Sequence, residues 1–410
     1  SLPSRAAGED DRKEGFELSL EVLAASQVIC SQMITAGGAL LSRLGQFAAI
    51  LVDEVAQCTE LGAIVPIVQR GCSRLVLAGD HCQLPPNVQS QEAERRGLSL
   101  SLYGRLVRLG LEPFFLDTQF RSHPKLVEFV AAEIYGGKLK SGVTGADRPT
   151  LPGFPWPDPA VPLAFVEMGP NSVEQVEGES KQNSFEGEKV LDILQAVLDA
   201  GGCKITDIGI ITPYVAQVRY LRSAWQKRCR IAGGAGGGSP QKPAPGKKRK
   251  QIGQGEALEW AKDPRDLEIS SVDSFQGREK ELVLFSAVRA NRGGRVGFLG
   301  DWRRLNVMLT RAKRGMIVVG SGATLRHDAL WQSWLEWCER NGALIDRRAW
   351  IDTVSMAVRA ADSEVQRKGV KRLLELDAAP SDGAAFCAVA RARLGATHEE
   401  AGSWFRAVCG

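Results

Sequence analysis

Short apolar runs separated by polar segments recur along most of the chain. Between residues 26 and 116 the runs are SQVICSQM, AAILVDEV, RLVLAGD and LEPFFLD. Between residues 163 and 321 they are LAFVEM, DIGIITPY, ELVLFSAV and MIVVGS. Buried parallel strands are continuous apolar runs of this length, and helical segments between them are typical of strand-helix-strand units. The pattern therefore predicts an α/β protein with two parallel-sheet lobes in tandem.

Two segments have the period of an amphipathic helix. Residues 186–200 carry apolar side chains at helical spacing and stop before Gly201, a residue type that commonly ends helices. Residues 301–315 predict a second helix, with Asp301 as its N-cap and Gly315 just past its end. The buried stripe of this second helix would be Leu305, Met308, Leu309 and Ala312.

Composition divides the chain further. We expect a polar segment at residues 1–25, a first lobe at 26–116, a second lobe at 117–345 and a helical, Ala-rich extension at 346–410. A stretch rich in Gly, Pro and Lys interrupts the second lobe at about residues 227–266; it cannot bury enough apolar surface to fold, which predicts a disordered insertion. Its KKRK run fits a solvated charge cluster best, with a nuclear import signal or a nucleic-acid contact as the alternatives.

Overall composition is that of a globular protein, with 44% hydrophobic and 24% charged residues. The formal net charge of +4 permits nucleic-acid binding without requiring it. The nine cysteines form no C-x-x-C pair, which argues against a zinc site and a disulfide framework and implies a reducing compartment. No apolar run reaches the roughly 18 residues of a membrane span, and the polar start is not a signal peptide. We therefore expect a protein without a membrane partner, located in the cytoplasm and, if KKRK is an import signal, also in the nucleus.

Two strand ends in the first lobe carry candidate chemistry. Asp53 and Glu54 follow the apolar run AAILV, as in a Walker B element, and Gln83 follows the run RLVLAGD. A neutral amide in that position can hydrogen-bond a phosphate oxygen and an attacking water. Either segment alone also fits an ordinary strand end, but ligands bind at the carboxyl ends of parallel strands, where both lie. Such an NTPase also needs a G-x-x-x-x-G-K-[ST] phosphate cradle, which does not occur in the 410 residues.

The second lobe contains a candidate base-binding pair and a polar turn. Phe120 and Arg121 come shortly before Pro124, which suits the first turn of a helix, so the pair should lie in a strand-to-helix connection. The aromatic ring could stack on a purine while the guanidinium reaches a phosphate; a buried Phe and a surface Arg are the alternative. The polar turn before ELVLFSAV contains Asp273, Gln276, Gly277, Arg278 and Glu279.

The predicted helix 301–315 contributes two arginines. Arg304 and Arg311 would lie within about 20° of each other at the border of its buried stripe, at about 100° per residue. Such a pair can point into a cleft, or it can belong to a solvated basic face. The helix alone does not decide between these interpretations.

Six segments in order resemble motifs II to VI of superfamily 1 helicases: VDEVAQ, GDHCQLPP, QFRSHP, ITPY, SVDSFQGRE and RRLNVMLTRAKRG. Within that superfamily the chain is similar to the up-frameshift family, the helicases of nonsense-mediated mRNA decay. The segments GLSLSLYGRLV, GVTGADRP and VGFLGDWRRLNV extend the similarity, which covers about residues 26–345. The resemblance implies two RecA-like lobes, the first of them incomplete because the family's cradle strand and loop would precede residue 1.

The resemblance also implies a role for each matching residue. Asp53 would hold Mg²⁺ through water, Glu54 would orient or deprotonate the attacking water, and Gln83 would sense the γ-phosphate of ATP. Arg121 and Arg311 would act as arginine fingers. The implied nucleotide-binding residues are Phe120 at adenine, Glu279 at the ribose, and Gln276 and Arg304 in support. The implied nucleic-acid-binding residues are Thr35, Pro213, Tyr214 and Thr310.

The sequence departs from the family at two of these places. Gln32 stands where the family has a strand-contacting Thr, with Thr35 as its substitute, and Lys313 stands where Arg is frequent. Lysine keeps the charge of arginine but not its forked geometry. One nucleic-acid contact and one site contact therefore differ from the family pattern.

The leading hypothesis is an ATP-dependent RNA helicase that translocates 5′ to 3′ on single-stranded RNA and works with mRNA decay factors. In this interpretation the cradle lies upstream, and the 410 residues alone show no ATPase. A non-catalytic nucleic-acid-binding adaptor and a DNA helicase of the same superfamily are the alternatives, because backbone and stacking contacts do not choose RNA over DNA. An upstream G-x-x-x-x-G-K-[ST] would favour the enzyme, and ATPase stimulation by poly-U or poly-dT would separate RNA from DNA.

Overall fold

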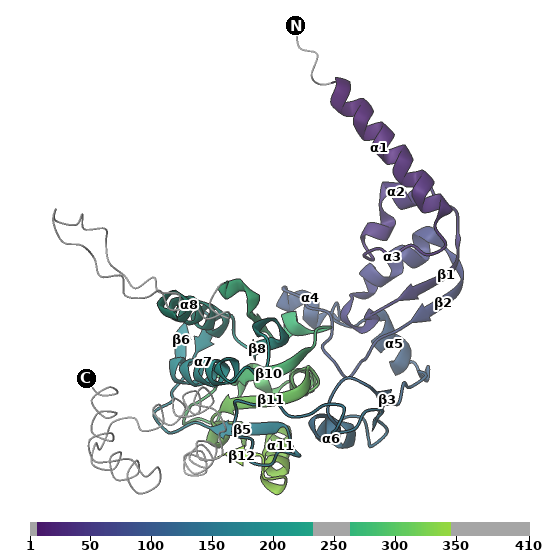
Figure 1. Ribbon diagram of the computed structural model, residues 1–410. Helices are drawn as coiled ribbons and strands as arrows, with labels where there is room; N and C mark the ends of the chain where they lie inside the picture. The colour runs from purple at the N-terminus through teal and green to yellow at the C-terminus, as the bar shows by residue number, and fades with distance from the viewer. Residues whose placement is uncertain (1–5, 233–262, 346–410) are drawn as a thin grey trace, which may run out of the picture. The chain divides into compact units, whose positions relative to one another are not determined.

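The computed structural model describes residues 6–232 and 263–345. The chain divides into two compact units, residues 1–115 and 116–410 (Figure 1). Each unit is built on parallel strands connected by helices. The α/β class predicted from the sequence is confirmed.

The first unit contains a two-stranded parallel sheet of β1 (Phe47–Val52) and β2 (Cys72–Leu77), connected by helix α3 (Glu60–Arg70). The Thr59 side chain caps α3, and Gly71, with φ of +63°, follows its last residue. The remaining elements are α1 (Ala6–Ala25), α2 (Ala39–Ser42), α4 (Gln91–Arg95), α5 (Leu102–Arg108) and short 3-10 helices at Thr35–Gly37 and Val55–Gln57.

Two strands predicted for this region are wrong. Residues 26–33 and 111–117 form neither strand, and in the described part of the chain β1 and β2 pair only with each other. A strand needs a neighbour that satisfies its backbone groups, and an apolar run does not supply one. The polar segment 1–25 contains helix α1, which the sequence analysis did not predict.

The second unit contains a six-stranded parallel sheet in the order β12-β5-β11-β10-β8-β9. Its strands are β5 (Leu163–Glu167), β8 (Ile208–Thr212), β9 (Glu268–Ser271), β10 (Lys280–Ser286), β11 (Ala312–Gly320) and β12 (Leu344–Ile345). The four apolar runs predicted for this lobe correspond to β5, β8, β10 and β11, so those predictions are confirmed.

The described residues of this unit also form two small sheets and six α-helices. The small sheets pair β3 (Thr118–Gln119) with β4 (Lys140–Ser141) and β6 (Gln175–Glu177) with β7 (Ser180–Gln182). The helices are α6 (Pro124–Glu133), α7 (Ser184–Asp199), α8 (Val215–Ala232), α9 (Trp302–Leu309), α10 (Gly322–Leu325) and α11 (Ala329–Arg340).

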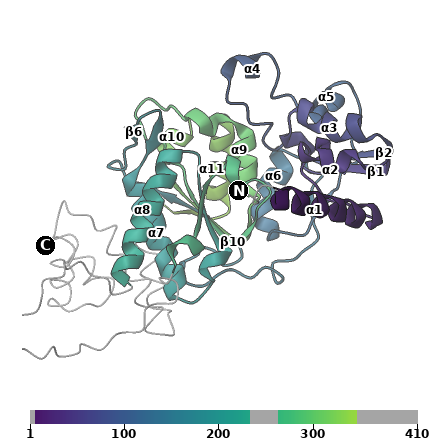
Figure 2. The same cartoon turned by 90° about the horizontal axis from the view of Figure 1, so that it is seen from above.

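Both faces of the six-stranded sheet are covered. Helices α7 and α8 lie side by side against it (Figures 1 and 2), and the buried core on this face includes Leu282 and Leu284 of β10. Because successive side chains of a strand point to opposite faces, Phe285 lies on the other face, where its ring contacts Trp331 of α11 at 6.4 Å between centroids. This double burial explains why the strands are continuous apolar runs.

The predicted helix 301–315 is partly wrong. Asp301 does cap α9, its side chain accepting a hydrogen bond from the Arg303 backbone N–H at 3.1 Å. The helix ends at Leu309, and Ala312 and Gly315 belong to β11. That strand pairs with both β10 and β5, so the backbone pairing available in mid-sheet outweighs the helical period of the sequence.

Both ends of the predicted insertion, residues 227–266, have regular structure. Residues 227–232 belong to α8, and Pro264–Asp266 form a short 3-10 helix. The rest of the predicted disordered insertion and the predicted helical extension 346–410 lie outside the described residues. Among the helices that are described, none combines the length and apolar character needed to cross a bilayer.

Candidate functional site

The carboxyl ends of β1 and β2 bring the candidate residues of the first unit together. Ala78 donates a backbone hydrogen bond to the carbonyl of Val52 (2.9 Å) and accepts one from Val55 (3.0 Å). These bonds join the turn that carries Asp53 to the loop that carries Gln83. The expectation that both strand ends meet at one edge of the sheet is confirmed.

Glu54 has a left-handed backbone conformation, with φ of 50° and ψ of 34°, which is uncommon for residues other than glycine. Its carboxylate accepts a hydrogen bond from Gln57 Nε2 (2.6 Å), and its N–H donates to Asp53 Oδ1 (3.0 Å). Both carboxylates are exposed. Two exposed carboxylates on a fixed turn fit Mg²⁺, a cation that prefers oxygen ligands.

Gln83 lies in a loop that packs closely against this turn. Its side chain Nε2 donates to Asp80 Oδ2 at 3.0 Å. Earlier in the loop, a Cβ on Gly79 would lie 3.0 Å from the backbone nitrogen of Ala56 and 3.2 Å from Val55 Cγ1. Glycine therefore permits the close approach of this loop to Val55 and Ala56, which directly follow the two carboxylates.

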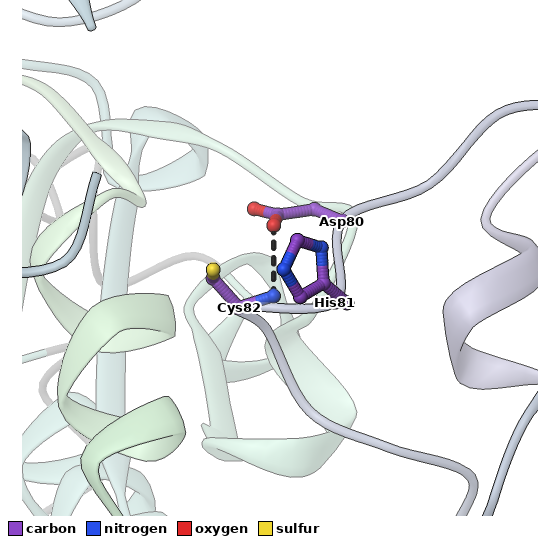
Figure 3. Close-up of side chains that lie close together, drawn as sticks. All are labelled: Asp80, His81 and Cys82. Carbon is purple, nitrogen blue, oxygen red and sulfur yellow. Dashed lines mark hydrogen bonds between the residues drawn. The ribbon is translucent and has the colours of Figure 1, made fainter. Parts of the chain in front are cut away.

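Three potential metal ligands also converge in this loop. Figure 3 shows Asp80, His81 and Cys82, whose ligand atoms lie within 4.8 Å of one another. The Cys82 backbone N–H donates to Asp80 Oδ1 at 2.9 Å, so the turn itself brings the side chains together. Burial, and after it the charge of Asp80, raises the pKa of the Cys82 thiol to about 11, whereas metals bind the thiolate. We assign no metal to this cluster, which the sequence analysis missed because it considered only cysteine spacing.

In the second unit, Phe120 and Arg121 lie in the connection between β3 and α6, as predicted. His123 caps α6 and Pro124 is its first residue. Phe120 is 65% exposed, so the alternative of a buried phenylalanine is wrong. An exposed aromatic ring offers a face on which a base can stack.

Arg121 belongs to a network of ion pairs. Its Nε donates to Glu279 Oε2 at 2.5 Å, and its Nη1 donates to the Thr310 carbonyl at 3.2 Å. Lys313 Nζ lies 2.8 Å from Glu279 Oε1. Hydrogen bonds from Lys313 and then from Arg121 lower the pKa of Glu279, which keeps this carboxylate ionised at neutral pH. Glu279, the predicted ribose ligand, thus forms ion pairs with both Arg121, the predicted arginine finger, and Lys313.

Arg304 and Gln276, the two residues predicted to support nucleotide binding, belong to the same unit as this network. Arg304 contacts Asp273 through two hydrogen bonds of 3.1 and 3.3 Å, and its guanidinium carbon lies 5.3 Å from the centre of the Phe298 ring. Gln276 follows the 3-10 helix at Asp273–Phe275. Its Nε2 is buried and finds no hydrogen-bond partner among the described residues. An orphaned donor of this kind fits a ligand oxygen.

Arg311 is 2% exposed and lies in the turn between α9 and β11. Its Nε donates to the Val307 carbonyl at 2.9 Å and its Nη2 to Thr310 Oγ1 at 2.8 Å. The solvated-face alternative is therefore wrong for Arg311, and so is its placement beside Arg304 on one helix. Its role as an arginine finger stays a prediction.

The predicted nucleic-acid-binding residues differ in accessibility. Thr35 is exposed and Pro213 is partly buried. Tyr214 is buried, and its hydroxyl accepts a hydrogen bond from Arg289 Nη1 at 3.1 Å. The hydroxyl of Thr310 donates to a carbonyl of α9 at 2.8 Å. The hydroxyls of Tyr214 and Thr310 thus make hydrogen bonds within the second unit. The assignment of all four residues to nucleic-acid binding stays a prediction.

Arg289, which was not predicted from the sequence, orders this region. Its Nε donates to Glu174 Oε2 at 2.9 Å while Nη1 holds Tyr214. Val288, just before it, has φ of 69°, a strained value for a β-branched residue. The available signal was an arginine directly after the buried run ELVLFSAV.

Two family profiles match the chain, each described as an AAA domain, over residues 4–91 and 98–323. The chain is 39% identical over 326 residues to the regulator of nonsense transcripts 1 homolog of Drosophila melanogaster and 36% identical over 328 residues to that of Arabidopsis thaliana. It is 35% identical over 327 residues to the ATP-dependent helicase upf1 of Schizosaccharomyces pombe.

Each of these similarities covers 80% of this chain but 25%, 24% and 32% of the respective relative. The chain therefore spans about a quarter to a third of the length of these relatives. The second profile alone covers more than half of the chain. The chain belongs to the AAA-domain family, and the resemblance to the up-frameshift family predicted from its motifs is confirmed.

Proposed function

We propose that this chain carries the helicase lobes of an ATP-dependent RNA helicase that acts in nonsense-mediated mRNA decay. The names of similar proteins support this function, since they include an ATP-dependent helicase and regulators of nonsense transcripts. The observation that carries it is the cluster of Phe120, Arg121 and Glu279, which combines an exposed aromatic ring, a guanidinium and a carboxylate in one unit. These groups fit the base, phosphate and ribose of a nucleotide.

The first unit would supply the metal and water functions of the reaction. Asp53 would hold Mg²⁺, Glu54 would orient or deprotonate the attacking water, and Gln83 would hydrogen-bond the γ-phosphate. Bound Mg²⁺ would neutralise charge on the phosphate oxygens. The left-handed backbone at Glu54 supports this role, because strained conformations cluster at active sites.

The second unit would bind the nucleoside and stabilise developing charge. Phe120 would stack on adenine, Glu279 would accept hydrogen bonds from the ribose hydroxyls, and Arg121 would stabilise charge on the transferred phosphoryl group. Gln276 and Arg304 would support this site. A ribose hydroxyl that donates to Glu279 competes with Arg121 for the same carboxylate, so nucleoside binding would help to release the guanidinium for the phosphate.

The family resemblance supports proposals for the nucleic-acid substrate and the partner proteins. We propose single-stranded RNA as the substrate, 5′ to 3′ translocation, mRNA decay factors as partners, and a cytoplasmic location with the nucleus as a second site. Thr35, Pro213, Tyr214 and Thr310 would contact the RNA, with Arg289 holding Tyr214. Positively charged residues and stacking surfaces alone would also accept single-stranded DNA.

The test is RNA-stimulated ATP hydrolysis. The chain is assayed alone and within a longer polypeptide that adds a G-x-x-x-x-G-K-[ST] element, each with poly-U and with poly-dT. Without a cradle nothing holds the β- and γ-phosphates in line with the water, so turnover is expected only in the longer protein. It should be stimulated by poly-U and abolished by Glu54→Gln.

The other outcomes decide between the alternatives. Stimulation by poly-dT alone would indicate a DNA helicase. Nucleic-acid binding without turnover in the longer protein would indicate an adaptor.

A further inference from the structure

The connection that carries Phe120 and Arg121 is supported by a second segment, residues 142–148, which follows β4. The Phe120 ring packs directly over Gly142: a Cβ built on this glycine would lie 2.2 Å from ring atom Cε1 and 2.6 Å from Cδ1. No side chain fits there without moving the ring. Gly142 has no positive φ, so the space under the ring, and not the backbone conformation, requires glycine.

Arg148 fixes the backbone of the same connection. Its Nη2 donates to the Phe120 carbonyl at 2.9 Å and its Nε to the Arg121 carbonyl at 2.8 Å. A third hydrogen bond, from Nη1 to the Asp147 carbonyl (3.1 Å), holds the guanidinium in place. One planar fork thus binds two successive carbonyls, a geometry that lysine cannot reproduce.

The side chain of Gln119 holds the opposite edge of the connection. Its Oε1 accepts hydrogen bonds from the N–H groups of Arg121 (2.9 Å) and Ser122 (2.8 Å). Its Nε2 donates to the Ser122 carbonyl and to Ser141 Oγ, both at 2.8 Å. The carbonyls of residues 120 and 121 therefore depend on Arg148, while the following N–H groups depend on Gln119.

We propose that Gly142 and Arg148 are positioning residues for nucleotide binding. Gly142 sets the height and tilt of the Phe120 ring, and Arg148 holds the backbone from which the Phe120 and Arg121 side chains project. The base-stacking ring and the phosphate-directed guanidinium then share one rigid support before any nucleotide binds. This inference rests on the proposed function, because it assigns a role to the support only if Phe120 and Arg121 bind nucleotide.

The chain offers matched controls for both residues. Arg314 also donates one hydrogen bond to a backbone carbonyl next to this segment, that of Pro149 (2.8 Å), and its hydrogen bond within the described residues goes there and not to residues 120 or 121. Gly169 also lacks a positive φ, and its Cβ position has no atom within 4 Å. The test compares Arg148→Ala and Arg148→Lys with Arg314→Ala, and Gly142→Ala with Gly169→Ala.

The first measurement is hydrogen exchange at the N–H groups of Arg121 and Ser122 in the full chain without nucleotide. These N–H groups belong to the two peptide units whose carbonyls Arg148 binds. Loss of the hydrogen bonds from this charged donor should let both units open more often and raise exchange about tenfold or more in Arg148→Ala, with Arg148→Lys in between. Arg314→Ala should leave it unchanged. Unchanged exchange in Arg148→Ala overturns the proposal for this residue.

The second measurement is the affinity for ADP and for inorganic pyrophosphate, measured by titration calorimetry in the longer polypeptide that adds the phosphate cradle. Gly142→Ala and Arg148→Ala should weaken ADP binding about tenfold, while Gly142→Ala, which displaces only the ring, should leave pyrophosphate binding unchanged. Equal ADP affinity in Gly142→Ala and the parent chain overturns the role of Gly142.

Phe120→Ala separates this proposal from the proposed function. If it binds ADP as well as the parent chain does, the assignment of Phe120 to adenine fails. The exchange data still decide whether Arg148 orders the connection.

Discussion

The two units contain strands of similar composition in opposite surroundings. In the second unit, β8 and most of β10 are buried, and helices cover both faces of the sheet. In the first unit, β1 and β2 pair only with each other among the described residues, and a small core that includes Val52, Ala63 and Leu102 packs against them. The apolar side chains of Leu51 and Val76 are still 68% and 50% exposed. Apolar strands of this kind are stabilised when helices or neighbouring strands bury their apolar side chains.

This difference separates two kinds of candidate chemistry. In the second unit a complete core fixes β10 and β11, and the ion pairs among Arg121, Glu279 and Lys313 rest on that scaffold. In the first unit Asp53 and Glu54 follow a strand with little cover. The residues proposed to bind the nucleoside thus lie on a well-packed scaffold, whereas those proposed to bind the metal follow a strand with few covering contacts.

The largest expected effect is a difference in hydrogen exchange between the two sheets. Backbone N–H groups in the middle of β10 exchange only when the core of the second unit opens, whereas those of β1 lie in a small, partly covered sheet. We expect β10 to be protected at least about 10³-fold more than β1, as measured by exchange of the full chain followed by mass spectrometry. Equal protection would show that the first unit is as stable as the second.

A matched pair of substitutions sharpens the same comparison. Leu284→Ala removes a fully buried side chain from β10 and should lower the free energy of unfolding of its unit by about 2 to 5 kcal/mol. Leu51→Ala, in β1, removes a largely exposed one and should change stability by less than about 0.5 kcal/mol. Urea unfolding would be followed by circular dichroism and by tryptophan fluorescence, since all nine tryptophans lie beyond residue 115. A large effect of Leu51→Ala would indicate that its strand is covered.

A smaller effect concerns pH. Glu186 is fully buried in the second unit, and burial raises its pKa to about 8. Between the unfolded value near 4.5 and this folded value the folded state holds one more proton, so stability falls as pH rises, by at most about 1.4 kcal/mol per pH unit. Glu186→Gln cannot titrate and should flatten this slope in urea unfolding at pH 5.5, 6.5 and 7.5. An identical slope in both proteins would mean that Glu186 ionises as it does in water.

The sequence predicts the fold best where burial is complete. The runs that become β5, β8, β10 and β11 are continuous and apolar because both faces of their sheet are covered. Strand β9 has one strongly apolar residue, Ile269, and β12 has two residues in all, too few to give a pattern. Segments 26–33 and 111–117 are apolar but find no strand to pair with among the described residues, and no local pattern reveals this.

The sequence predicted which residues belong to the candidate site, but it did not predict which side chains contact one another there. Asp53, Glu54 and Gln83 follow recognisable strand ends, and Phe120 precedes a helix signal. The ion pair of Arg121 with Glu279 joins residues 158 positions apart, and the fork of Arg148 depends on the placement of β4. Arg311 was misplaced because an apolar run with helical spacing also fits the start of a buried strand.

The most direct test of this account is ATP turnover by an Arg121→Ala variant in the longer polypeptide that adds a phosphate cradle. Of the two predicted arginine fingers, Arg121 is the better residue to substitute, because Arg311 is buried and its removal would also disturb the fold. We expect kcat for RNA-stimulated hydrolysis to fall by about 10³, in line with arginine-finger losses, with KM and melting temperature little changed. Arg314→Ala should leave turnover unchanged. Full turnover by Arg121→Ala would contradict the assignment of the second unit to ATP hydrolysis.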